Sequence, residues 1–203
     1  MQDVALDACC LINLCAAGMI LRPPARAQAK VRQGAKAWAS PKSPSGFGLN
    51  LHVPSKVTGE ALYIMQPDEE DQTKLVTRPV DLQEHITTGL LAPCDFQDQA
   101  EVELFVRMAA QLGDGEAACF AIATQRGWAL ATDDRRARRL AAESSLAVIT
   151  TPELVKVWAE KTKATDEEIA VVLQNIQRFA YFTPRGNAPE YAWWARCLGK
   201  AGK

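Results

Sequence analysis

The sequence predicts an α/β fold, a three-layer α/β/α sandwich around a central, mostly parallel sheet. Short apolar runs at 4–6, 128–131 and 147–149 have the length and composition of buried strands. Segments with helical character follow these runs, and strand–helix alternation at this spacing is typical of a parallel sheet with helices on both faces. The chain has 203 residues, 48% of them hydrophobic and 23% charged, which is enough to bury a full core without disulfides.

The elements can be placed in order along the chain. The first strand ends just before Asp7, and the helix after it stops at Gly18. We expect Ser55 to be the N-cap of a helix that reaches about Gln66, with Glu60 in its second turn. The other expected elements are a strand at 49–53, a loop at 67–74, a helix at 81–88, a strand at 90–94, helices at 98–112 and 116–127, a basic helix ending near 142, and helices at 152–161 and 166–180.

Composition suggests two parts. We expect residues 1–162 to form one domain with a basic insertion at about 22–48, and residues 163–203 to form a helical C-terminal extension packed on it. The insertion lies in a stretch from Cys15 to Gly59 that has no Asp or Glu. It is either a linker or a basic surface that binds an acidic partner or the backbone of RNA.

Cysteine usage and hydropathy indicate a cytoplasmic protein. The six cysteines form no CxxC pair, and with two histidines no Cys/His zinc spacing is present. We expect the thiols to be small buried groups in a reducing compartment. The N-terminus lacks the basic start of a signal peptide, and no run of 18 uncharged apolar residues predicts a membrane span.

Acidic residues mark the ends of predicted strands. Asp7 and the Asp133–Asp134 pair each follow a short apolar strand and precede a helix. Carboxylates at the carboxyl ends of parallel strands can converge over one crevice. Glu116 opens a helix after a glycine turn, and Glu60 lies early in another predicted helix. Crowded carboxylates repel one another and raise each other's pKa values unless a cation compensates. Oxygen ligands suit Mg²⁺, and such a site suits phosphodiester hydrolysis.

The same segments resemble a known family, the PIN-domain nucleases. VALDACCLINL is similar to the first PIN strand, VPSKVTGEAL to the segment with the second acid, Glu60, and GDGEAACFAIATQRG to the helix with Glu116. ALATDDRRARRLA resembles the last acidic strand end, with Asp133 and Asp134. The resemblance covers about residues 3–160. It implies a Mg²⁺ or Mn²⁺ nuclease that usually acts on RNA, often the VapC toxin of a toxin–antitoxin pair, in a branch with these GE and DD motifs.

The resemblance and the strand ends together give the expected roles. Which of Asp133 and Asp134 faces the metal stays open; its place directly after the strand favours Asp133, and Asp134 lies nearer the helix cap. We expect RNA and an antitoxin protein as partners, and a homodimer. The expected catalytic residues are Asp7, Glu60, Glu116 and Asp133; the expected metal ligands are Asp7, Glu116, Asp133 and Asp134; the expected substrate contacts are Asn13, Arg135 and Arg138.

Two other functions compete with a nuclease. A phosphatase of the haloacid-dehalogenase type needs a second Asp two residues after the first, where Cys9 stands, and a receiver domain needs a Lys that 147–151 does not offer. A PIN-like module that binds RNA or protein without cleavage is the main alternative. The complete acidic set argues against it.

Overall fold

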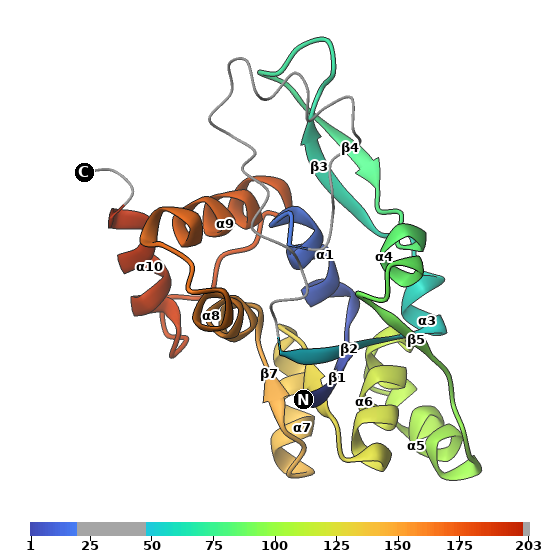
Figure 1. Cartoon of the computed structure of the whole chain (residues 1–203). Helices are drawn as coiled ribbons and strands as arrows, with labels where there is room; N and C mark the ends of the chain where they lie inside the picture. Colours follow the sequence, from blue (N-terminus) through green and yellow to red (C-terminus); the bar gives the residue numbers. More distant parts are fainter. Residues whose placement is uncertain (20–47, 201–203) are drawn as a thin grey trace.

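The computed structural model of the chain describes residues 1–19 and 48–200 and confirms the predicted α/β fold (Figure 1). The basic insertion expected at about 22–48 lies, apart from its last residue, outside the described residues. Five strands form a parallel sheet in the order β5-β2-β1-β6-β7. Their bounds are Gln2–Leu6 for β1, Leu49–Pro54 for β2, Ala92–Cys94 for β5, Ala129–Ala131 for β6 and Val148–Ile149 for β7.

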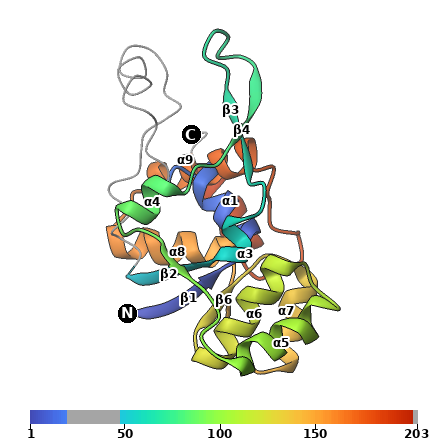
Figure 2. The ribbon, with the colours of Figure 1, turned by 90° about the vertical axis from the view of Figure 1, so that its right-hand side faces the viewer.

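Helices cover both faces of this sheet (Figures 1 and 2). One face carries α5 (Gln99–Ala109), α6 (Asp114–Arg126) and α7 (Arg135–Glu143). The opposite face carries α1 (Ala8–Ala16) and α8 (Thr151–Thr162), on which α9 (Asp166–Phe179) and α10 (Tyr191–Lys200) continue the layer. A short helix, α4 (Gln83–Thr87), precedes β5.

Strand β1 is the centre of the sheet and of the core. Val4 pairs with Leu51 of β2 on one side and with Ala129 of β6 on the other. A strand that is covered on both faces must be apolar along its length, and Val4 to Leu6 are completely buried. Large side chains from the two helical layers close the core around it, among them Leu11, Leu14, Phe120, Leu154 and Trp158.

The prediction of a helix from Ser55 to about Gln66 is wrong. The helix α3 spans only Ser55–Thr58, its N-cap is Pro54, and the Ser55 hydroxyl donates to Asp95 instead of capping the helix. Gly59 closes α3, and Glu60 therefore lies in the connection after it and not in a second turn.

The chain then forms a hairpin apart from the main sheet (Figure 1). Strand β3 (Tyr63–Pro67) pairs antiparallel with β4 (Leu75–Pro79), so the expected loop at 67–74 is the tip of this hairpin. Alternating side chains of Tyr63 to Gln66 suit a half-buried strand, and pairing with β4 outweighs helix propensity. The helical interpretation overlooked β4 as the partner strand.

The C-terminal helices join the same core. Thr165 caps α9 as expected, because its Oγ1 accepts a hydrogen bond from the Glu168 amide. Val172 and Ile176 of α9 and Trp194 of α10 belong to the core cluster that includes β1. Helix α10 is an addition to the expected elements. Within residues 1–19 and 48–200, no helix combines the length and the apolar character that a membrane crossing requires.

Candidate metal centre and active site

Three neighbouring strands end in polar residues at the same edge of the sheet. Asp7 follows β1, Thr132 follows β6, and Thr151 opens α8 just after β7. Strands β1, β6 and β7 are adjacent and parallel, so their carboxyl ends point the same way. The fold therefore gathers residues that lie far apart in the sequence.

Asp7 is buried, with only 1% of its surface exposed. Its Oδ1 accepts a 2.6 Å hydrogen bond from the Ala8 amide, which makes Asp7 the N-cap of α1. Its Oδ2 accepts from Cys9 Sγ at 3.1 Å and from Thr132 Oγ1 at 2.9 Å. Burial raises the pKa of Asp7, with the charge of Asp134 acting in the same direction and the hydrogen bonds against it.

The two aspartates after β6 point to different neighbours. Asp134 is the N-cap of α7, where its Oδ1 accepts from the amides of Arg136 at 2.7 Å and Ala137 at 2.8 Å. The expected position of Asp134 at the helix cap is thus confirmed.

Asp133 turns toward α1 and α8. Its Oδ2 accepts from Asn13 Nδ2 at 3.0 Å and from Thr151 Oγ1 at 2.5 Å. Its Oδ1 accepts from the Thr151 amide at 3.0 Å. Burial raises the pKa of Asp133, and these hydrogen bonds lower it. The carboxylate of Asp133 is therefore engaged by structural partners.

Glu60 and Glu116 lie near enough to Asp7 for its charge to act on both. Glu116 lies in the first turn of α6, and its Oε2 accepts from the Gly113 amide at 3.2 Å. The carboxylate of Glu60 is held by the Gly115 amide at the start of the same helix. Helix N-termini favour negative charge, so the beginning of α6 suits both side chains.

These acids influence one another electrostatically. Burial is the largest cause that raises the pKa of Glu60, and the charges of Asp7 and Asp114 raise it further. Burial also raises the pKa of Glu116, and the charges of Asp7, Asp134 and Glu60 add to it. Asp7, Glu60, Glu116 and Asp134 thus form one acidic centre, the name used for them below.

The acidic centre has the donor set of a divalent cation site. Within residues 1–19 and 48–200, none of its carboxylates forms an ion pair with Lys, Arg or His. Repulsion among these charges is therefore not offset by an ion pair within the described residues. A hard cation with oxygen ligands, such as Mg²⁺ or Mn²⁺, fits this arrangement.

The expected substrate-contact residues lie in two environments. Asn13 is buried and donates to both Asp133 and Thr151 Oγ1, each at 3.0 Å. Arg135 is exposed and Arg138 half-buried on α7, directly after Asp134. Only the arginines face solvent next to the acidic centre.

Three further residues organise this edge. Thr132, Thr151 and Cys9 donate hydrogen bonds to Asp7 or Asp133. The two threonines follow β6 and β7, so the pattern that identified Asp7 could also have identified them. For Cys9, the sequence held no comparable signal.

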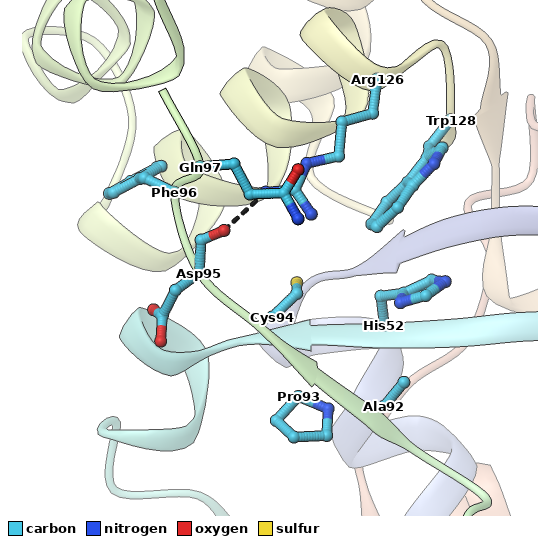
Figure 3. Close-up of a pocket in the computed structure, with 9 residues that line it drawn as sticks. All are labelled: His52, Ala92, Pro93, Cys94, Asp95, Phe96, Gln97, Arg126 and Trp128. Atoms are coloured by element: carbon cyan, nitrogen blue, oxygen red, sulfur yellow. Dashed lines mark hydrogen bonds between the residues drawn. The ribbon is translucent and has the colours of Figure 1, made fainter. Parts of the chain in front are cut away.

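A separate pocket of about 490 Å³ lies at the other end of α6 (Figure 3). His52 stacks on Trp128 with ring centroids 4.0 Å apart, and Arg126 Nε donates to Glu101 Oε1 at 2.7 Å beside them. Arg126 is ten residues after Glu116 on α6, a separation of about 15 Å along the helix. None of the pocket-lining residues belongs to the acidic centre.

Comparison with known proteins identifies one family. A sequence profile described as PIN domain matches residues 51–186. No curated protein and no solved structure matches the chain. The matched segment contains Glu60, Glu116, Asp133 and Asp134, and β1 with Asp7 precedes it. By this match over most of its length, the chain belongs to the PIN-domain family.

Proposed function

We propose that this protein is a metal-dependent endoribonuclease that hydrolyses RNA at the acidic centre. Membership of the PIN-domain family supports a nuclease-type function in general. The observation that carries the proposal is the convergence of four carboxylates: the charge of Asp134 raises the pKa of Asp7, and the charge of Asp7 raises the pKa values of Glu60 and Glu116. Among the described residues, none of these carboxylates forms an ion pair with a basic side chain. Repulsion among these carboxylates destabilises the fold unless a cation binds between them.

Each acid has a distinct part in this proposal. Asp7, Glu116 and Asp134 would hold a Mg²⁺ or Mn²⁺ ion. The bound ion would supply Lewis acidity toward a phosphate oxygen and toward water. Glu60 is exposed at the rim of the site, where it can position the attacking water or join the ligands. Arg135 and Arg138 can neutralise phosphate charge next to the cleaved bond.

The direction of the two side chains favours Asp134 as the ligand of the Mg²⁺ or Mn²⁺ ion, because the charge of Asp134 acts on Asp7 and Glu116 whereas Asp133 turns toward α1 and α8. Asp133 accepts three hydrogen bonds from Asn13 and Thr151, whereas only Oδ1 of Asp134 is used in capping α7. Oδ2 of Asp134 is therefore available for a cation. Asp133 would instead link α1 and α8 through its hydrogen bonds to Asn13 and Thr151, next to the acidic centre.

The GE and DD motifs lead to a finer proposal. The protein would act in the cytoplasm as a VapC-like toxin, as a homodimer, and an antitoxin protein would restrain it. The two-part organisation, with a nuclease domain at 1–162 and an extension at 163–203, belongs to this proposal. A small neighbouring gene for a DNA-binding antitoxin would support the toxin role.

The test is cleavage of a mixed RNA pool by purified protein, with Mg²⁺, with Mn²⁺ and with chelator. We expect cleavage only with a divalent ion, and loss of cleavage in Asp7→Asn. This variant removes a charge but keeps the shape of the side chain. Cleavage in chelator, or by Asp7→Asn at the rate of the unaltered protein, contradicts the mechanism. RNA binding without any cleavage supports the alternative, a non-catalytic PIN module.

A further inference from the structure

Two thiols and a carboxylate come together next to the acidic centre. Cys9 and Cys10 open α1, and Asp133 follows β6. Their ligand atoms, two Sγ and one carboxylate oxygen, all lie within 4.8 Å of one another. Asp133 is 123 residues from Cys10 in the sequence, so no ligand spacing along the chain reveals this group.

Hydrogen bonds hold these three side chains in place. Cys10 Sγ lies 3.5 Å from Asp133 Oδ2, and the Asp133 amide donates to Cys9 Sγ at 3.3 Å. Asn13 and Thr151 hold the same Oδ2 from the other side. Cys10 is buried, whereas Cys9 is half-exposed and gives access from solvent.

The donor atoms of this group differ in chemistry from those of the acidic centre. Two sulfurs and one oxygen are a poor set for Mg²⁺, which prefers oxygen ligands. They suit a borderline-soft ion such as Zn²⁺, which binds Cys, His and carboxylate in tetrahedral geometry. Three protein ligands leave a fourth position for water.

We propose that Cys9, Cys10 and Asp133 form a second cation site, selective for thiophilic divalent ions such as Zn²⁺. Binding forms two metal–sulfur bonds and one metal–oxygen bond, and the two thiol protons leave to solvent. Asn13 and Thr151 act as partners that orient the carboxylate ligand.

The proposed site is coupled to the acidic centre through Cys9. Cys9 Sγ donates to Asp7 Oδ2 at 3.1 Å. A metal-bound thiolate has no proton to donate, so Zn²⁺ would remove one of the hydrogen bonds that orient Asp7. We therefore expect Zn²⁺ to inhibit Mg²⁺-dependent cleavage; this consequence, unlike Zn²⁺ binding itself, rests on the proposed function.

Direct binding is the decisive measurement. The full chain competes with a chromophoric chelator for Zn²⁺, in the presence of excess Mg²⁺ that saturates hard sites. We expect Cys9→Ser to weaken Zn²⁺ binding at least about tenfold, because it removes a thiolate ligand. The serine hydroxyl can still donate to Asp7. Cys94→Ser, at another half-exposed cysteine on β5, is the matched control and should bind Zn²⁺ like the unaltered protein.

A second variant, Cys10→Ala, and a second ion, Cd²⁺, test whether the two thiols themselves bind the metal. Cys10→Ala should also lose the site, and thermal unfolding checks that both variants fold. Cd²⁺ should give the ultraviolet charge-transfer band of cadmium–thiolate bonds, reduced in Cys9→Ser. Equal Zn²⁺ affinity in Cys9→Ser and the unaltered protein overturns the proposal. If binding depends on Cys9 but no RNA is cleaved under any condition, the thiol site stands and the nuclease proposal falls.

Discussion

Gly115 and Glu60 lie in such close contact that a Cβ atom on Gly115 would stand 2.1 Å from Glu60 Oε1. The Gly115 amide also holds that carboxylate. The absence of a side chain at Gly115 thus decides where Glu60 can lie relative to the rest of the acidic centre. A side chain at position 115 would displace the Glu60 carboxylate, which is the end of a flexible side chain and can move away.

The first prediction follows from this contact. Gly115→Ala should lower metal-dependent cleavage at least about tenfold, since Glu60 must leave its place. Alanine within a helix gains about 1 kcal/mol over glycine, which offsets strain against Val57, so the melting temperature should change little. Gly113→Ala is the matched control, because its Cβ would meet Glu116 Oε2 at an ordinary 3.8 Å. Equal cleavage by the two variants would show that the position of Glu60 is unimportant.

The second prediction separates the two aspartates after β6. Asp134→Asn keeps the cap of α7, since Asn is as good an N-cap as Asp, but it removes the charge from the acidic centre. We expect a loss of cleavage with unfolding free energy changed by less than about 0.5 kcal/mol. Asp133→Asn disturbs hydrogen bonds to Asn13 and Thr151 and should cost about 1–3 kcal/mol.

Urea unfolding and RNA cleavage, measured on both variants, distinguish these outcomes. The reverse result has a clear meaning. If Asp133→Asn loses cleavage at unchanged stability while Asp134→Asn keeps it, then Asp133 is the metal ligand, as its place after the strand had suggested.

The third prediction concerns pH. The pKa of Asp7 is raised above 3.8 and that of Glu116 above 4.5, mainly by burial. A carboxyl group with a raised folded-state pKa contributes stability that is complete below its unfolded pKa and is lost as pH rises through the folded one. Mg²⁺ binds the ionised form and should reverse this loss.

The measurement is the unfolding free energy with Mg²⁺ and with chelator, from about pH 4 to about pH 8. The two curves should meet at the acidic end and separate as pH rises through the raised pKa values. Other carboxylates, such as Glu101, whose pKa is lowered chiefly by hydrogen bonding to Arg126, affect both curves alike. In Asp7→Asn the separation should shrink. A separation that does not depend on pH would contradict a cation site made of these acids.

The fourth prediction tests Arg135 and Arg138 as phosphate contacts. Replacing both with alanine should weaken RNA binding and reduce the slope of log K against log salt by about 1.4, the value for two contacts on a single strand. Filter binding at several salt concentrations, with Ca²⁺ to prevent cleavage, gives the slope. Arg139→Ala is the control on the same helix, because Arg139 lies 3.7 Å from Glu143 in an exposed ion pair. A slope reduced equally by the control would assign the effect to general charge.

Much of the sheet was predictable from local sequence. Buried parallel strands are short apolar runs, and a polar residue after each run marks the carboxyl edge; Asp7 after β1 and Thr132 after β6 illustrate this pattern. The hairpin was not predictable in the same way, because Tyr63 to Gln66 take strand conformation only by pairing with Val76 to Pro79. Such pairing is a tertiary effect that outweighs local propensity.

The acidic residues of the site could be predicted from the sequence, but the directions of their side chains could not. Consecutive residues after a strand point in different directions, and the partners decide which one faces the centre. For Asp133 these partners are Asn13 and Thr151, which arrive from two other helices. The Cys9–Cys10–Asp133 group could not be predicted from the sequence for the same reason. Its members lie on α1 and after β6, which are far apart in the sequence and come together only in the folded chain.

The central place of β1 also sets the order in which the molecule can be completed during synthesis. Its two neighbours are formed by residues 49–52 and 129–131, and the Asp7–Thr132 hydrogen bond spans 125 residues. A nascent chain that has not yet released β6 therefore carries its first strand with one edge unpaired, and Asp7 lacks its hydrogen bond from Thr132. Contacts of such long sequence separation form slowly. The acidic centre is consequently among the last features to be assembled, and the RNA cleavage proposed above would begin only after β6 has left the ribosome.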